Sequence, residues 1–280
     1  MIPSQIWGGR SYVNFIKSLF GNKKSEEPSR DLRPLVEPLA VPAVHVVKQA
    51  EVTRSYFGGD PLLPPNIKWP QRGDEPLAFL ARLSLSELAS VLPIDWLPRE
   101  GALLFFYDVE SQPWGFDPKD RGGWAVLHVP DVDPSRPGDA YSIGFQRIAV
   151  LPSSERKTVT ALAFNDTEFD GYLAMADEPF GSHPKHQVSG FPSPVQGDRM
   201  ELECQLVSHG LFCGNSSGYK DPRAAELEPG SAQWRLLFQM DTDDDLNVMW
   251  GDLGMLYFWV EEGAARAGRF DNVWLVLQCS

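Results

Sequence analysis

The sequence contains few cysteines and lacks the apolar segments of leaders and membrane anchors. Its three cysteines, Cys204, Cys213 and Cys279, cannot all pair with one another, and a disulfide-stabilised domain would carry more of them. Residues 1–20 lack the basic stretch, apolar run and cleavage site of a signal peptide. No run of about 18 apolar residues occurs, which argues against a transmembrane helix. We therefore expect a protein of the reducing cytoplasm.

Positive charge is also scarce. The 280 residues include 25 lysines and arginines against 38 aspartates and glutamates, so the formal net charge is −13. A nucleic-acid-binding face needs many cations to neutralise phosphates, so this composition argues against nucleic acid as a partner. Neither G-x-x-x-x-G-K-[ST] nor G-x-G-x-x-G occurs, so the sequence has no typical phosphate-binding glycine loop. An acidic protein of this kind favours a protein partner with a basic surface.

The residues that are abundant indicate a sheet-rich α+β fold with antiparallel strands and a few short helices. Hydrophobic residues make up 42% of the chain, and 24 prolines and 24 glycines separate short apolar runs, a pattern typical of strands. Residues 200–206 alternate apolar and polar side chains, which favours a half-buried strand and leaves a helix as the alternative. We further predict strands over 102–107, 124–129, 146–151, 235–240, 255–260 and 273–278, and short helices over 86–92 and 264–267.

Two stretches about 150 residues apart resemble each other. The segments FLARL at 79–83, ALLFF at 102–106 and WAVL at 124–127 correspond to LLFQM at 236–240, MLYFW at 255–259 and WLVL at 274–277. Trp96 and Trp250 occupy equivalent places between the first two segments. We interpret the pattern as an internal duplication, at about 77–129 and 234–279, within a single domain that spans residues 35–280.

Residues 1–34 form a basic arm before this domain. Six basic side chains against three acidic ones give the arm a charge of +3 and leave −16 for the rest of the chain. Hydrophobic residues recur at three- and four-residue intervals over residues 12–20, which predicts a short amphipathic helix. Such a helix either packs on the main domain or makes a peripheral contact with a membrane surface or a partner.

Three groups of motifs carry a family resemblance. They are FGGDPLLP at 57–64, WP at 69–70 and PLAFL at 76–80; HQ at 186–187, GFP at 190–192 and Gln196; and QMDTDD at 239–244, MWGDLGMLYFW at 249–259, FD at 270–271 and LQC at 277–279. Over about residues 40–280 the chain resembles the YwqG-like family, a bacterial domain of unknown function. The resemblance implies a sheet-rich α+β fold and supplies no catalytic residues. Arg82 stands where that family more often has glutamine.

An acidic run offers ligands for a divalent cation. Residues 241–245 (DTDDD) are followed by Asp252, eleven positions after Asp241. Carboxylate oxygens bind calcium, but the glycine that an EF-hand loop needs is missing, so only a looser loop site fits. No other cofactor is expected. With Asp241, Asp243 and Asp252 as ligands and His186 as a base, the alternative function is a metal-assisted hydrolase.

A second group of metal-ligand residue types lies nearer the middle of the chain. It comprises His183, His186, Cys204, His209 and Cys213. Zinc sites use such side chains, but the C-x2-C and H-x3-H spacings are missing, which favours buried thiols and hydrogen-bonded histidines instead.

Aromatic residues beside glycine and proline turns indicate a binding groove. Trp114 and Phe116 flank a glycine, and Phe191 precedes a proline. An aromatic surface with acidic edges suits a protein partner or a cationic ligand. We therefore predict a non-enzymatic binding module, such as an immunity or antitoxin protein that neutralises a basic partner; a small-molecule scaffold is a further alternative. The candidate binding residues are His186, Phe191, Gln196, Trp250 and Asp252.

Overall fold

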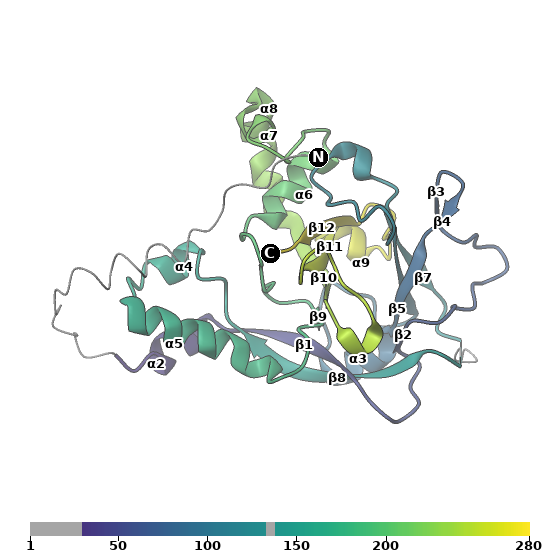
Figure 1. Cartoon of the computed structure of the whole chain (residues 1–280), viewed down its shortest axis with the longest axis horizontal. Helices are drawn as coiled ribbons and strands as arrows, with labels where there is room; N and C mark the ends of the chain where they lie inside the picture. Colours follow the sequence, from purple (N-terminus) through teal and green to yellow (C-terminus); the bar gives the residue numbers. More distant parts are fainter. Residues whose placement is uncertain (1–29, 133–137) are drawn as a thin grey trace, which may run out of the picture.

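The computed structural model describes residues 30–132 and 138–280, and its main element is a ten-stranded antiparallel sheet (Figure 1). The strands are β1 (Val41–Lys48), β2 (Tyr56–Phe57), β5 (Ala78–Ser84), β6 (Ala102–Tyr107), β7 (Trp124–Val129), β8 (Tyr141–Val150), β9 (Gln187–Val188), β10 (Trp234–Asp241), β11 (Met255–Glu261) and β12 (Trp274–Gln278). Their order is β12-β11-β10-β9-β1-β8-β2-β5-β6-β7. The short strands β3 (Gln71–Arg72) and β4 (Glu75–Pro76) form a separate hairpin.

The sheet confirms the α+β, sheet-rich expectation. All six strands predicted from apolar runs are present, although β8 begins five residues before its predicted start. Strand β1, which pairs with β8 and β9 in the middle of the sheet, has no counterpart among the predicted strands. The helix predicted over residues 12–20 lies outside the described residues.

Strands β5-β6-β7 and β10-β11-β12 form two similar three-strand units. Neighbouring strands in each unit are antiparallel and follow one another in the sequence. The pairing register shifts at Leu80 in β5 and at Leu237 in β10, which are equivalent positions of the sequence repeat. Because such bulges increase the local twist of a strand, both units bend at corresponding places.

The edge strands β7 and β12 approach each other, so the sheet is nearly closed. Trp124 Nε1 donates a hydrogen bond to the carbonyl oxygen of Val273 over 2.9 Å. The rings of Trp124 and Trp274 meet edge to face, with centroids 5.1 Å apart. The N–H of Leu277 donates to the carbonyl oxygen of Trp114 over 3.0 Å. The loop between β6 and β7 therefore lies against β12 and joins the two edges.

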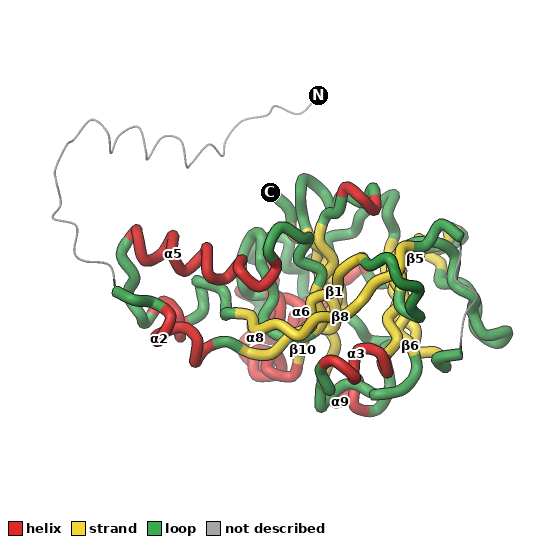
Figure 2. The backbone as a smooth tube through the Cα atoms, turned by 90° about the horizontal axis from the view of Figure 1, so that it is seen from below, coloured by secondary structure: helices red, strands yellow, loops and turns green. Residues whose placement is uncertain are grey.

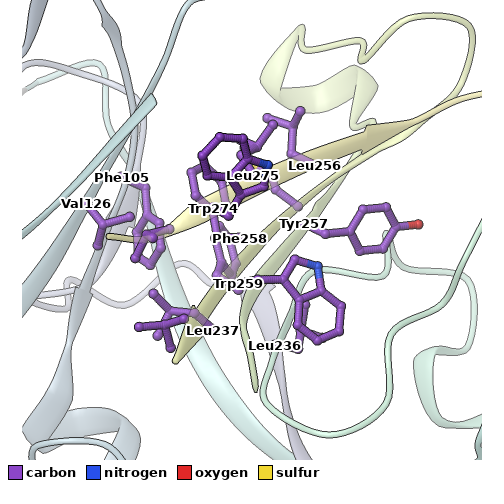
Figure 3. Close-up of a cluster of buried hydrophobic side chains, with 14 of the residues drawn as sticks. Phe105, Val126, Leu236, Leu237, Leu256, Tyr257, Phe258, Trp259, Trp274 and Leu275 are labelled. Atoms are coloured by element: carbon purple, nitrogen blue, oxygen red, sulfur yellow. The ribbon is translucent and has the colours of Figure 1, made fainter. Parts of the chain in front are cut away.

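Large aromatic side chains pack between the two units (Figure 3). Figure 3 shows Phe105 of β6 beside Phe258 of β11, and their ring centroids are 5.1 Å apart. The ring centroid of Phe238 lies 4.9 Å from that of Phe105. An aromatic side chain buries about 150–250 Å², and each Å² of apolar surface contributes about 25 cal/mol to stability. This core holds the two units together.

The helices are short and lie around the sheet. They are α2 (Arg33–Val36), α3 (Leu85–Val91), α4 (Lys157–Thr160), α5 (Asp166–Asp177), α6 (Met200–Ser208), α7 (Ser217–Lys220), α8 (Pro222–Leu227) and α9 (Glu262–Arg266), with 3-10 turns at Glu37–Leu39, Pro118–Asp120, Glu178–Phe180, Glu228–Gln233 and Asp244–Leu246. The predicted helices over 86–92 and 264–267 correspond to α3 and α9. Helices α2, α4 and α5 gather at one end of the molecule, opposite the β3–β4 hairpin (Figure 1), and Figure 2 shows α2 and α5 at the same end.

The strand predicted over residues 200–206 is wrong, because this stretch forms helix α6. Met200, Cys204 and Val207 are fully buried and have the spacing of one helical face. Glu203, which the alternation placed on an exposed face, is buried as well. The alternating pattern therefore did not separate a buried face from an exposed one.

Two further expectations concern cysteines and membrane spans. All three cysteines are free and buried. Across residues 30–132 and 138–280, no helix combines the length and apolar character that a membrane crossing requires.

Candidate functional site

His186 is buried next to β10, and its ring is fully hydrogen-bonded. Nδ1 accepts the N–H of Asp241 over 3.0 Å, so the ring proton is on Nε2, which donates to Asp243 Oδ2 over 3.2 Å. Phe57 packs on the imidazole, with ring centroids 4.9 Å apart. Since both nitrogens are engaged within the protein, this histidine joins β9 to the loop after β10, and neither nitrogen is free to act as a base.

The acidic loop holds a lysine ammonium. Lys48 Nζ lies 3.2 Å from Asp243 Oδ1 and 2.5 Å from Asp245 Oδ2. Burial raises the pKa of Asp243, but hydrogen bonds from His186 and Lys48 outweigh it and lower that pKa to about 2. Asp243 is therefore an ionised carboxylate with its own protein cation.

The other two predicted metal ligands point to different partners. Asp241 Oδ2 accepts the N–H of Lys185 over 2.8 Å. Asp252 is exposed, and its carbonyl oxygen accepts the N–H of Ser280. Among the described residues, no group of three or more histidine, cysteine, aspartate and glutamate side chains is arranged to hold a metal ion. The structure thus does not bring Asp241, Asp243 and Asp252 together as one ligand set.

The remaining predicted binding residues lie in separate places. Trp250 belongs to the core, where it packs edge to face on Tyr107 and donates through Nε1 to the carbonyl oxygen of Asp241 over 3.1 Å. Phe191 lines a hollow of about 320 Å³ and lies under the guanidinium of Arg156, 5.0 Å from its carbon. Gln196 is exposed and lines a different pocket, described below.

A hollow lies beside the β3–β4 hairpin, and we call it the β3–β4 groove. It is about 1180 Å³ in volume, with an apolar surface from residues such as Trp69 and Leu77. Arg72 is the one cation among its described lining residues and is paired with Asp108 over 2.9 Å. Its other carboxylates belong to Asp60, Glu75 and Glu110, all of them exposed. Within the described residues, none of these three has an ion pair.

A second hollow, which we call the α6 pocket, is lined in part by the loop between β6 and β7. It is about 570 Å³ in volume and shares Ser111 with the β3–β4 groove. Of the residues that the structure describes, no lysine or arginine lines it. Its aromatic and acidic lining residues are Trp114, Phe116, Phe212, Tyr219, Asp117, Asp120 and Glu203. Trp114 and Phe212 are 42% and 39% exposed, so both rings present surface to a ligand.

Glu203 is the most unusual group of the α6 pocket. Its Oε1 accepts a hydrogen bond from Tyr219 Oη over 2.9 Å, whereas Oε2 is buried without a partner among the described residues. Burial raises the pKa of Glu203, and burial also raises the pKa of the neighbouring Cys213 thiol to about 11. The pocket thus contains a carboxyl group with one unused oxygen and an unreactive thiol.

The sequence pointed to part of this region only. Trp114 and Phe116 stand out beside their glycine, and Asp60 belongs to a quoted motif. Glu203 did not stand out, because its burial depends on α6 being a helix and on Tyr219, sixteen residues away. A carboxylate inside an otherwise apolar helical stripe is the signal that identifies it.

Both hollows lie within a recognised family of domains. Residues 55–279 match the family model described as "Domain of unknown function (DUF1963)". No curated protein matches the chain. The match includes the residues of both hollows and all strands of the sheet except β1. Because it spans most of the sequence, the chain belongs to the DUF1963 family of domains of unknown function.

Proposed function

We propose that this chain is a non-enzymatic binding module that takes a basic protein partner on one acidic face. The observation that carries the proposal is the pair of adjoining hollows, the β3–β4 groove and the α6 pocket, which meet at Ser111. Carboxylates outnumber cations in both, and apolar and aromatic side chains lie between them. Such a surface offers desolvated contacts together with charge complementarity to lysine and arginine.

Most carboxylates of the β3–β4 groove form no ion pair within the described residues. Arg72 is engaged by Asp108, which leaves Asp60, Glu75 and Glu110 with no cation among the described residues. The net charge of −13 adds a long-range field of the same sign. Such a field speeds the association of a cationic partner and disfavours nucleic acid.

The finer part of the proposal concerns the biological role. As a YwqG-like member of its family, the chain would act in the bacterial cytoplasm and neutralise a basic partner, in the manner of an immunity or antitoxin protein. This role requires no catalysis. His186 and Asp243, the pair that most resembles a catalytic dyad, are hydrogen-bonded to each other, and Asp243 is also bound by Lys48.

The test is the binding of a fluorescent decalysine peptide by fluorescence anisotropy. We expect the triple variant Asp60→Asn, Glu75→Gln, Glu110→Gln to weaken binding about tenfold, because three exposed charges contribute about 0.2–1 kcal/mol each. The matched control removes three exposed carboxylates elsewhere, through Asp170→Asn, Glu226→Gln and Asp271→Asn. Both triple variants change the net charge equally, so equal weakening by the two, or no binding by the wild type, would overturn the proposal.

A further inference from the structure

We infer that the α6 pocket is a binding site for an alkylammonium group, the cationic end of a lysine side chain. The inference deepens the proposed function and rests on it for the source of the cation, a basic protein partner. Three features of the described residues carry it: the aromatic walls of the pocket, charged lining side chains that are all acidic, and the oxygen of Glu203 that has no hydrogen-bond partner.

The aromatic walls come from separate parts of the chain. Trp114 and Phe116 belong to the loop between β6 and β7, Phe212 follows α6, and Tyr219 lies in α7. The N–H of Cys213 donates to the carbonyl oxygen of Phe116 over 2.8 Å and holds two of these segments together. Aromatic rings attract ammonium groups through their quadrupole, and several rings around one cavity are a recurrent way to bind them.

The carboxylates of the loop are held in place before any ligand arrives. Asp120 Oδ2 accepts the N–H of Gly115 over 2.9 Å, and Asp117 Oδ1 accepts the N–H of Lys119 over 2.9 Å. Each carboxylate keeps further lone pairs for a ligand. Among the described residues, no lysine or arginine lines the pocket, so these two carboxylates meet no cation of the described lining.

Glu203 supplies the observation that points to a ligand. Its side chain is nine-tenths buried, Oε1 is bound by Tyr219, and Oε2 has no partner within the described residues. Arg199 stacks on Tyr219, 5.0 Å from the ring centroid. Its charge lowers the pKa of Glu203, but burial raises that pKa by more, so Arg199 offsets the cost of the buried carboxylate only in part. An ammonium group bound beside Oε2 would remove the cost that remains.

The shape of the region indicates where the rest of the ligand lies. The pocket of about 570 Å³ is larger than one alkylammonium group, and it shares the lining residue Ser111 with the β3–β4 groove. A lysine side chain in the pocket therefore leaves its main chain on the acidic face. This favours a side chain of a partner over a free amine.

The experiment uses the full chain and three small probes. They are N-acetyl-lysine methylamide, its uncharged analogue N-acetyl-norleucine methylamide, and n-butylammonium, titrated while the tryptophan indole N–H signals are followed by NMR. Trp114→Phe assigns the Trp114 signal. We expect the lysine probe to shift this signal with a millimolar Kd, and the norleucine probe to bind at least tenfold more weakly.

Variants separate the pocket from the rest of the protein. We expect Glu203→Gln, and independently Trp114→Ala, to weaken the lysine probe at least fivefold. Glu226→Gln, on the exposed side of α8, should leave it unchanged. Trp114→Ala removes an exposed side chain and keeps the backbone bond to Leu277, so it tests the site even if Glu203→Gln impairs folding.

The outcomes for the pocket and for the proposed function are distinguishable. The ammonium site would be falsified if the lysine and norleucine probes bound equally, or if neither pocket variant weakened the binding of the lysine probe. Either result holds independently of the affinity for decalysine. Tighter binding of n-butylammonium than of the lysine probe would overturn the partner as the source of the cation. The lysine probe could bind in the pocket while the triple variant of the groove carboxylates binds decalysine as tightly as the wild type does. This result would retain the ammonium site and overturn the proposed function.

Discussion

At the scale of single residues, the ionisable side chains of Lys48, His186 and Asp243 stabilise the fold by bonding to one another. Lys48 lies in β1 and Asp243 in the loop after β10, 195 positions apart in the sequence. The backbone N–H of Asp241 fixes the proton of His186 on the nitrogen that faces Asp243. The three side chains therefore link β1, β9 and the acidic loop through charge-assisted hydrogen bonds.

The depressed pKa of Asp243 makes stability depend on pH. The folded-state pKa of about 2 lies below the unfolded value of about 3.9, so the stabilisation is present above pH 4 and is lost as pH falls through 2. We expect Asp243→Asn to lower the free energy of unfolding at pH 6 by about 1–3 kcal/mol. Urea unfolding at pH 6, 4, 3 and 2 should show the gap between wild type and variant closing toward pH 2. A gap that stays constant would contradict this role of the carboxylate.

The residue types of the candidate site were predictable, but their partners were not. Trp114 and Phe116 stand beside a glycine in the sequence, which indicates exposed aromatic rings near a turn. The role of Asp243 depends on a lysine far away in the chain, and that of Glu203 depends on Tyr219 across two helices. Such contacts are set by tertiary packing, which hydrophobic periodicity does not encode.

At the scale of elements, strands inside dense apolar runs were predictable and strands without them were not. The six predicted strands carry continuous or alternating apolar residues, whereas β1 contains Pro42 and His45 and β9 has only two residues. The register shifts at Leu80 and Leu237 fall at equivalent positions of the sequence repeat. The internal duplication itself stays a prediction.

The loop between β6 and β7 depends on one glycine for its approach to β12. Gly115 has φ +80°, and a Cβ placed there would lie 1.7 Å from the carbonyl oxygen of Leu275. Gly122 has φ +94° and open space around its Cβ position, so it is the matched control. Both alanine variants should cost about 1–2 kcal/mol for the left-handed backbone, and Gly115→Ala about 1–3 kcal/mol more for the clash. Equal melting temperatures for the two variants would show that the close approach is not required.

At the scale of the whole molecule, the near closure of the sheet places the two hollows side by side. The loop that carries Ser111 and Trp114 leaves β6 in the first unit and lies against β12 in the second. The acidic face is thus built at the point where the ends of the sheet meet. We expect any change that separates the two edge strands to alter binding as well as stability.

The indole of Trp124 tests this closure. Trp124→Phe removes the donor to Val273 and leaves a buried carbonyl oxygen unpaired. Trp259→Phe is the matched control, because Trp259 Nε1 is already buried without a partner among the described residues. We expect Trp124→Phe to reduce the free energy of unfolding by about 1–3 kcal/mol more than Trp259→Phe. Chemical denaturation measures this difference, provided that the two variants have equal m-values. A larger loss of unfolding free energy for Trp259→Phe would refute the expectation.

The central place of β1 has a consequence for synthesis of the chain. Its main partner, β8, lies about 100 residues further along, since Val41 pairs with Val150 and Lys48 with Ile143. At a translation rate of about 5–20 residues per second, β1 emerges from the ribosome roughly 5–20 s before β8 exists. During that interval the strand exposes unpaired N–H and C=O groups beside valine side chains, a template for pairing with other chains. Chaperone binding to the nascent chain should therefore centre on residues 41–48.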